Sequence, residues 1–128
     1  MSRALDDLSP RFKPLAMQLL ARAVEAGIPI LIVETRRTPE QHAANLAKGV
    51  SWVKHSKHLD GDAIDVVPYA LWDDQGPDKL KWDAADPAWS RLADIARGLG
   101  LRCGFDWVQK DCGHYEWQDP PASETTRV

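Results

Sequence analysis

The sequence of 128 residues has only two cysteines and no long apolar run. A membrane-spanning helix needs about 20 consecutive apolar residues, so the sequence argues against a transmembrane protein. Its first residues, "MSRALDDLSPRF", carry charges and a proline where a secretory signal has a continuous apolar stretch. We therefore expect a protein made in the cytoplasm, in which Cys103 and Cys112 are reduced bystanders.

Positive charge is also scarce, because 16 Lys and Arg stand against 19 Asp and Glu and leave a net charge of −3. Binding to a nucleic acid backbone depends on clustered Lys and Arg, so nucleic acid is not an expected partner. The hydrophobic share of 44% and the charged share of 27% are typical of a globular protein. The length predicts a single domain, residues 1–128, that needs no disulfide or metal to form a core.

Helix and strand signals are mixed without a regular β-α-β alternation, which predicts an α+β fold with a small, mainly antiparallel sheet and about three flanking helices. Helices are expected where a capping residue precedes an apolar stripe of helical spacing and a glycine ends it. Strands are expected where β-branched residues cluster. The predicted helices run from Ser9 to Gly27, from Thr38 to Gly49 and from Asp86 to Gly98 or Gly100; the predicted strands are Ile28–Glu34, which we expect to be buried, Ala63–Pro68, a short one near Leu101, and Gly113–Trp117. Residues 69–86 are expected to form a loop, and the tail after Asp119 to be frayed.

The segment "SKHLDGDAIDVVPY", Ser56–Tyr69, combines a histidine and aspartates with a glycine just before a predicted strand. A catalytic zinc site uses three protein ligands from His, Asp, Glu or Cys and one open position. His58 and Asp65 are candidates for two of them, since Gly61 permits a tight turn between them and Asp65 would project from the new strand toward the loop that carries His58.

Three histidines remain as candidates for the third ligand. His42 lies in a predicted helix, His55 precedes His58 by three residues, and His114 begins the last predicted strand. His114 is the strongest because a carboxylate, Asp111, precedes it by three residues. A base at that distance can reach a metal-bound water.

Each of these residues also has an ordinary structural interpretation. A single histidine beside a strand is more often structural than a ligand, and Asp60 and Asp62 can be turn formers. Arg36 and Arg37 alone would be solvated. The six tryptophans could suggest sugar stacking, but Trp89 lies on a helix stripe and is expected in the core.

The combination of three separated segments resembles the D-alanyl-D-alanine carboxypeptidase type of zinc peptidases, which includes the phage L-alanyl-D-glutamate endopeptidases. "SKHLDGDAID" matches the family signature Ser-x-His-x-x-Gly-x-Ala-x-Asp; "VETRRTPEQHAANLAKG" is similar to its Arg-Ser/Thr segment and helix, and "CGFDWVQKDCGHYEW" to its Gly-Asp-Trp and Asp-x-x-His-aromatic-Glu segments. The likeness covers roughly Ile32 to Trp117 and implies a hedgehog/D-Ala-D-Ala-peptidase-like fold.

The resemblance implies a Zn²⁺ enzyme with His58, Asp65 and His114 as metal ligands and Asp111 as catalytic base. Arg37 would bind the substrate or stabilise the oxyanion, and Ser56 would hold the substrate or the ligand loop. The family usually has an aromatic residue where Arg36 stands, so which arginine enters the site is left open. Glu116 is the alternative base.

The implied function is cleavage of the L-alanyl-D-glutamate bond of peptidoglycan stem peptides by a phage or prophage endolysin, monomeric and without a separate cell-wall-binding domain. Such an enzyme would wait in the cytoplasm of the infected bacterium and act on the wall after release. The alternatives are a D-alanyl-D-alanine carboxypeptidase, a zinc-containing wall-binding module without activity, and a small globular protein whose histidines are structural. The target bacterium and a second, regulatory ion are not indicated by the sequence.

Overall fold

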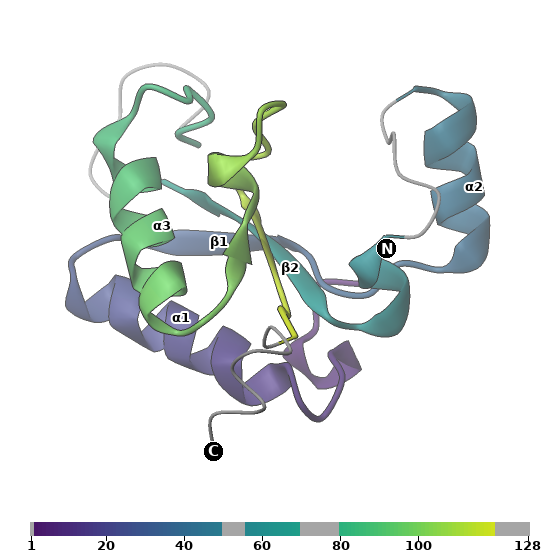
Figure 1. Ribbon diagram of the computed structural model, residues 1–128, viewed down its shortest axis with the longest axis horizontal. Coiled ribbons are helices and arrows are strands. Elements are labelled where there is room, and N and C mark those ends of the chain that lie inside the picture. The colour runs from purple at the N-terminus through teal and green to yellow at the C-terminus, as the bar shows by residue number, and fades with distance from the viewer. Residues whose placement is uncertain (1, 50–55, 70–79, 120–128) are drawn as a thin grey trace.

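The sheet has four strands in the order β1-β2-β4-β3, and every neighbouring pair is antiparallel (Figure 1). The structure is a computed structural model that describes residues 2–49, 56–69 and 80–119. Strands β1 and β3 form the two edges, and β2 and β4 lie in the centre. The strands are β1 (Ile30–Glu34), β2 (Ala63–Pro68), β3 (Arg102–Cys103) and β4 (His114–Glu116).

Two of the three α-helices in the described part of the chain, α1 (Lys13–Glu25) and α3 (Pro87–Gly98), contact each other and pack on the sheet (Figure 1). The remaining one, α2 (Pro39–Ala47), lies apart from them at the far end of the molecule (Figure 1). None of the described helices is long and apolar enough to cross a membrane. The expected α+β class, with a small antiparallel sheet and three helices, is confirmed.

The core forms between α1, α3 and one face of the sheet. Because side chains of a strand alternate between its two faces, Ile64 and Val66 of β2 point into this core together with Tyr115 of β4, and all three are fully buried. Trp89 of α3 is buried in the same cluster, as its place on the helix stripe predicts. The opposite face of the central strands carries the polar side chains of Asp65, His114 and Glu116, beside the buried Ala63 and Val67.

Most predicted elements are present. Thr38 and Gln41 form the expected capping box of α2, and Asp86 caps α3. The predicted strand Ala63–Pro68 has the bounds of β2. Residues 70–79 of the predicted loop, the tail from residue 120 and His55 lie outside the described residues.

The first helix and the first strand differ from expectation. Helix α1 begins at Lys13 and not at Ser9 or Pro10, because Ser9 starts a separate turn in which its carbonyl accepts from Phe12 and Lys13. Strand β1 is only half-buried, and Leu31 is 48% exposed. An apolar run therefore marks a strand here but not a buried one, since β1 is at the edge of the sheet.

Candidate metal centre

The strand register brings Asp65 and His114 together. Asp65 of β2 pairs directly with His114 of β4, and residues that face each other across two strands carry their side chains on the same face. His58 comes from a short 3-10 helix, η2 (Lys57–Asp60), which contacts β2. Gly61 ends η2 with φ of 75°, and a Cβ atom there would lie 2.8 Å from the backbone nitrogen of Ser9. The turn between His58 and Asp65 thus needs glycine, as expected.

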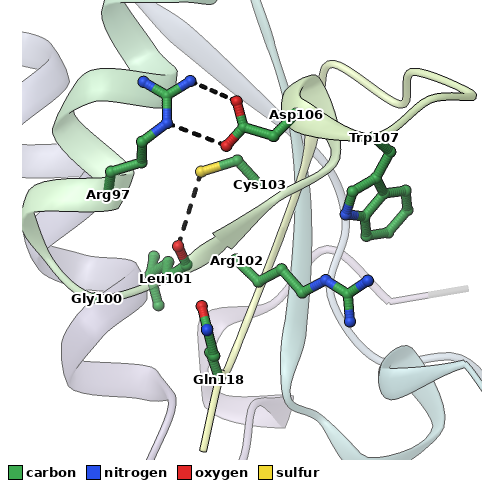
Figure 2. A pocket seen from close by; sticks show the side chains of 8 residues that line it. All are labelled: Arg97, Gly100, Leu101, Arg102, Cys103, Asp106, Trp107 and Gln118. Carbon is green, nitrogen blue, oxygen red and sulfur yellow. Dashed lines mark hydrogen bonds and ion pairs between the residues drawn. The ribbon is translucent and has the colours of Figure 1, made fainter. Parts of the chain in front are cut away.

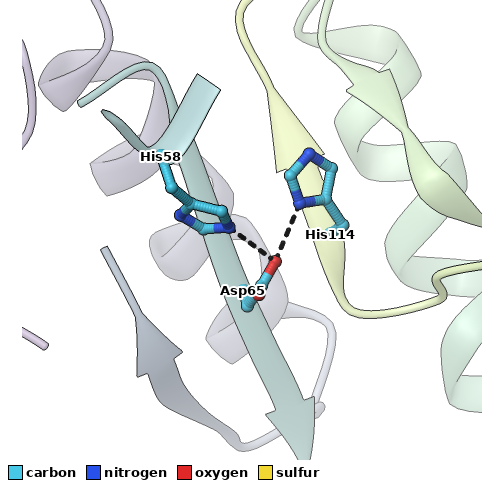
Figure 3. Close-up of side chains that lie close together, drawn as sticks. All are labelled: His58, Asp65 and His114. Carbon is cyan, nitrogen blue, oxygen red and sulfur yellow. Dashed lines mark hydrogen bonds and ion pairs between the residues drawn. The ribbon is translucent and has the colours of Figure 1, made fainter. Parts of the chain in front are cut away.

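The three side chains converge on one point (Figure 3). Asp65 Oδ1 lies 3.2 Å from His58 Nε2 and 2.9 Å from His114 Nδ1. The three possible ligand atoms all lie within 4.8 Å of one another. The structure therefore joins the His, Asp and His that the sequence singled out into a group that can hold a metal ion.

The protonation of His58 favours a cation at this point. Its Nδ1 lies 2.6 Å from the backbone carbonyl of Thr35, and because a carbonyl only accepts, Nδ1 carries the proton. In the neutral form of the ring, Nε2 then presents a lone pair toward the carboxylate of Asp65, and this buried atom has no hydrogen-bond partner among the described residues. Two acceptors that face each other in a buried site repel unless a cation lies between them.

The second histidine is held between two carboxylates. His114 Nε2 lies 2.8 Å from Glu116 Oε1, and the other oxygen of Glu116 lies 3.3 Å from Lys57 Nζ. Burial alone would lower the pKa of His114, but hydrogen bonds with Asp65 and Glu116 outweigh it and raise the pKa to about 10. With Nε2 taken by Glu116, Nδ1 is the nitrogen that faces the metal group, and a bound metal ion would replace the proton on it.

Asp65 itself is kept ionised. Burial alone would raise the pKa of its carboxyl group, but the neighbouring imidazoles, His114 first and His58 next, hold the pKa far below its ordinary range. A carboxylate that stays charged beside two imidazole nitrogens is a suitable ligand for a divalent cation.

Asp111 is fixed by the backbone beside this group. Its N–H donates to the carbonyl of Gly104 at 2.9 Å, and its own carbonyl accepts from the N–H of His114 at 3.1 Å. A Cβ atom on Gly104 would lie 2.1 Å from the Asp111 carbonyl oxygen, so only glycine permits this approach. Burial, and next the charge of Asp65, raise the pKa of Asp111, which strengthens it as a proton acceptor.

Arg37, and not Arg36, turns toward the site. The side chain of Arg37 is 11% exposed and forms an ion pair with the buried carboxylate of Glu34. Arg36 is exposed, and its Nη1 lies 3.4 Å from the backbone carbonyl of Asp7. Burial and the ion pair with Glu34 therefore favour Arg37 as the arginine of the site.

Ser56 is buried, and its hydroxyl accepts from the backbone N–H of His58 at 3.2 Å. It therefore caps the turn that carries His58. The sequence alone suggested that Asp62 only forms a turn, but in the structure it has a further role. The Asp62 carboxylate is buried and accepts from the Ser9 hydroxyl at 2.5 Å and from Arg11 Nη2 at 2.7 Å, which ties this segment to the residues before α1.

Sequence reasoning missed Glu34 and Thr35, which contact the group, and Lys57, which pairs with Glu116 beside it. Thr35 acts through its backbone carbonyl, for which side-chain identity gives no signal. Lys57 was visible only as a neighbour of His58. Glu34 ends a predicted strand two residues before an arginine pair, and that proximity of opposite charges was the one signal available.

A separate groove of about 290 Å³ lies along the β3 edge of the sheet (Figure 2). It holds the exposed ion pair between Arg97 and Asp106, and Arg102 lies over the ring of Trp107 at 5.2 Å. Trp107 also lies against His114, with ring centroids 5.2 Å apart. Trp107 therefore forms a wall that the groove shares with the metal group.

Comparisons with known proteins agree with this geometry. A family model described as phage L-alanyl-D-glutamate peptidase matches residues 2–120. The L-alanyl-D-glutamate peptidase of Escherichia phage T5 is 35% identical over 104 residues, which cover 74% of this chain and 72% of the relative.

The protein of the same name from Listeria phage A118 is 36% identical over 107 residues, which cover 80% of this chain and 35% of that protein. The chain thus spans about a third of the Listeria phage relative. The crystal structure of the Serratia marcescens L-Ala D-Glu endopeptidase ChiX has a similar fold, with a TM-score of 0.68, 21% identity, and coverage of 89% of this chain and 83% of that one.

Proposed function

This chain belongs to the phage L-alanyl-D-glutamate peptidase family, and on that premise we propose that it is a zinc enzyme that hydrolyses the bond between L-alanine and D-glutamate in peptidoglycan stem peptides. The observation that carries the proposal is the convergence of His58 Nε2, Asp65 Oδ1 and His114 Nδ1 on one buried point. Two nitrogens and one carboxylate oxygen are a ligand set of catalytic zinc, which leaves a fourth position open.

The charges around the group support a divalent ion. Glu34 is neutralised by Arg37, and Glu116 by Lys57. Among the described residues no Lys or Arg forms an ion pair with Asp65 or Asp111, and the basic partners of Asp65 are the two histidines of the group itself. A dication balances the two carboxylates.

Zinc bound by these ligands would supply Lewis-acid activation of water and of the scissile carbonyl. Asp111 would accept a proton from the attacking water on its carboxylate and pass it to the amine of D-glutamate as the peptide C–N bond breaks. Arg37 would hold a carboxylate or the developing oxyanion of the substrate. Ser56 would keep His58 in place through the backbone of η2.

The test is digestion of purified peptidoglycan followed by mass spectrometry of the fragments. New amino termini on D-glutamate are expected. Release of D-alanine instead would identify a D-alanyl-D-alanine carboxypeptidase, and metal binding without any cleavage would identify a wall-binding module. Elemental analysis should find about one zinc per chain, and a chelator should abolish cleavage.

The role of Asp111 is tested by Asp111→Asn, which keeps the size of the side chain but removes the base. We expect turnover to fall by about 10²- to 10⁴-fold with the zinc content unchanged. Asp94→Asn is the matched control, because Asp94 is 77% exposed on α3. Full activity of Asp111→Asn would transfer the base role, with Glu116 as the next candidate.

We also propose that the enzyme is a monomeric endolysin that is made in the infected bacterium and reaches the wall after release. The phage origin of its relatives supports this. Expression in a Gram-negative host should leave cells intact until the inner membrane is permeabilised and then lyse them. Lysis without permeabilisation, or no lysis after it, would contradict the proposal.

A further inference from the structure

A β-bulge directs Glu34 toward the metal group. The pairing of β1 with β2 runs Ile32 to Val66 and then Glu34 to Asp65, so Val33 is an extra residue on β1. Without this bulge Val33 would stand opposite Asp65. Since bulges redirect the side chains that follow them, Glu34 shares a face with Asp65, and Asp65 in turn pairs with His114. Glu34, Asp65 and His114 therefore form one row across β1, β2 and β4.

Glu34 is a buried carboxylate, 4% exposed, at the metal-facing end of β1. Its Oε1 lies 3.6 Å from His58 Nε2. A buried charge is costly unless it is paired, and Arg37 provides the partner. Arg37 Nε lies 3.2 and 3.3 Å from the two oxygens of Glu34, and Nη2 donates to Oε1. The side of the guanidinium that carries Nε is therefore occupied.

His42 of α2 holds the guanidinium from another direction. Its Nδ1 lies 3.1 Å from Arg37 Nη1. Arginine keeps all of its protons, so Nη1 donates and Nδ1 accepts. Of the five guanidinium N–H groups, Glu34 and His42 engage about three, which leaves roughly one on each terminal nitrogen. Two adjacent donors match the two oxygens of a carboxylate.

We propose that Glu34, together with His42, is a positioning residue that orients Arg37 so that its two remaining N–H groups bind the free carboxylate of the glutamyl residue of the stem peptide. This inference rests on the proposed function. Glu34 does not touch the substrate and acts only through Arg37. A glutamyl residue that continues the peptide through one carboxyl group keeps the other free, and that group is the ligand.

The first experiment is Glu34→Gln, which keeps the size of the side chain and removes its charge. The KM for a stem-peptide substrate should rise about 10- to 100-fold, with kcat within about threefold and zinc content unchanged. In an Arg37→Ala background the same substitution should cost less than about twofold, because the residue it orients is gone. An equal loss in both backgrounds would overturn the proposal in favour of a structural or metal-related role.

A second measurement does not depend on activity. The Nε–H proton of Arg37 should exchange slowly and be visible by NMR in the wild type and in Asp94→Asn, and should be lost in Glu34→Gln. An unchanged signal in Glu34→Gln would overturn the proposal. If the wild type fails to cleave peptidoglycan, the proposed function is wrong, and this signal still decides whether Glu34 holds Arg37.

Arg37→Lys covers the case in which Glu34→Gln does not fold. Lysine keeps the charge but cannot bind Glu34 and a carboxylate through separate donors of one rigid plane. We expect a similar rise in KM, and a KM within about twofold of the wild type would overturn the proposal.

Discussion

The two faces of the central strands are built from neighbouring residues and behave in opposite ways. Ile64 and Val66 point into the core, whereas Asp65 between them points to the metal group. In β4 the same alternation sets Tyr115 against His114 and Glu116. A shift of register by one residue would exchange the two faces.

The difference lies in what each face needs from the rest of the chain. The core face is stabilised by removal of apolar area from water, at roughly 25 cal/mol per Å², and tolerates many apolar neighbours. On the metal face each buried polar group needs a specific partner, such as the Thr35 carbonyl for His58 or Lys57 for Glu116. One face therefore supports the fold, and the other supports chemistry at a cost in stability.

The largest effect should follow from Asp65→Asn, which changes the metal face alone. The amide is a weak ligand and removes the charge that balances a dication. We expect the affinity for zinc to fall by more than about 100-fold and wall digestion to drop to the level without protein. Dialysis followed by elemental analysis measures the loss of zinc, with Asp94→Asn in parallel as the control. Stoichiometric zinc and normal cleavage in Asp65→Asn would show that Asp65 is not a metal ligand.

Leu92→Ala changes the core face alone, and it should lower the stability of the fold while leaving zinc binding intact. Leu92 is fully buried in α3, and truncation leaves a cavity that lowers the unfolding free energy by about 2–5 kcal/mol. Urea denaturation measures the loss. At urea concentrations well below the unfolding midpoint, the zinc content should remain unchanged. Val24→Ala is the control, since Val24 is 68% exposed on α1, and an equal loss there would contradict the assignment of Leu92 to the core.

Asp62→Asn tests the hydrogen bonds that Ser9 and Arg11 donate to the Asp62 carboxylate, which lies on neither of the two faces. Burial alone would raise the pKa of Asp62, but hydrogen bonds from Arg11 and Ser9 hold the pKa below its ordinary value. A lowered pKa stabilises the fold above the unfolded-state pKa of about 4, and this contribution is lost as the pH falls through the folded-state pKa.

The substitution should therefore lower the unfolding free energy by about 1 kcal/mol at neutral pH. The difference from the wild type should narrow as the pH falls below about 4, which a series of urea titrations can follow. A constant difference at every pH would show that ionisation of Asp62 is not its source.

The smallest effect is expected in the groove along β3. Arg97 and Asp106 form an ion pair there whose side chains are 42% and 46% exposed (Figure 2). Exposed pairs contribute about 0–1 kcal/mol and are weakened by salt. Asp106→Asn should change the unfolding free energy by less than about 1 kcal/mol, and by less still in 1 M salt. A larger loss that salt leaves unchanged would mean that the pair is not solvated.

The sequence predicted those features that depend on neighbours along the chain. The capping box at Thr38, the cap at Asp86 and the strand Ala63–Pro68 follow from local hydrogen bonds and side-chain shape, and the structure has them. Helix α1 was predicted about four residues too early because Ser9 and Pro10 suit a helix start equally well. A tertiary bond from Ser9 to Asp62 and a separate turn decide otherwise.

The candidate site divides in the same way. Spacing around Gly61 favoured His58 and Asp65, the carboxylate three residues earlier favoured His114, and the family resemblance agreed with all three, but Glu34 carried no comparable signal. Its place depends on the bulge at Val33, which is a property of how β1 pairs with β2. The choice between Arg36 and Arg37 likewise depends on which side chain reaches a buried carboxylate.

By itself the sequence therefore determined the elements, the class of the fold and the residue types of a metal site, because capping, periodicity and ligand chemistry act over a few residues. Only the tertiary structure decided which atoms face one another. His58 Nε2 is left as a buried acceptor by the Thr35 carbonyl, and Glu34 is set beside Arg37 by a bulged strand pairing. The contact of His58 with Thr35 joins residues 23 apart in the chain, and the register of β1 with β2 sets Glu34 beside the metal group, so both depend on tertiary pairing.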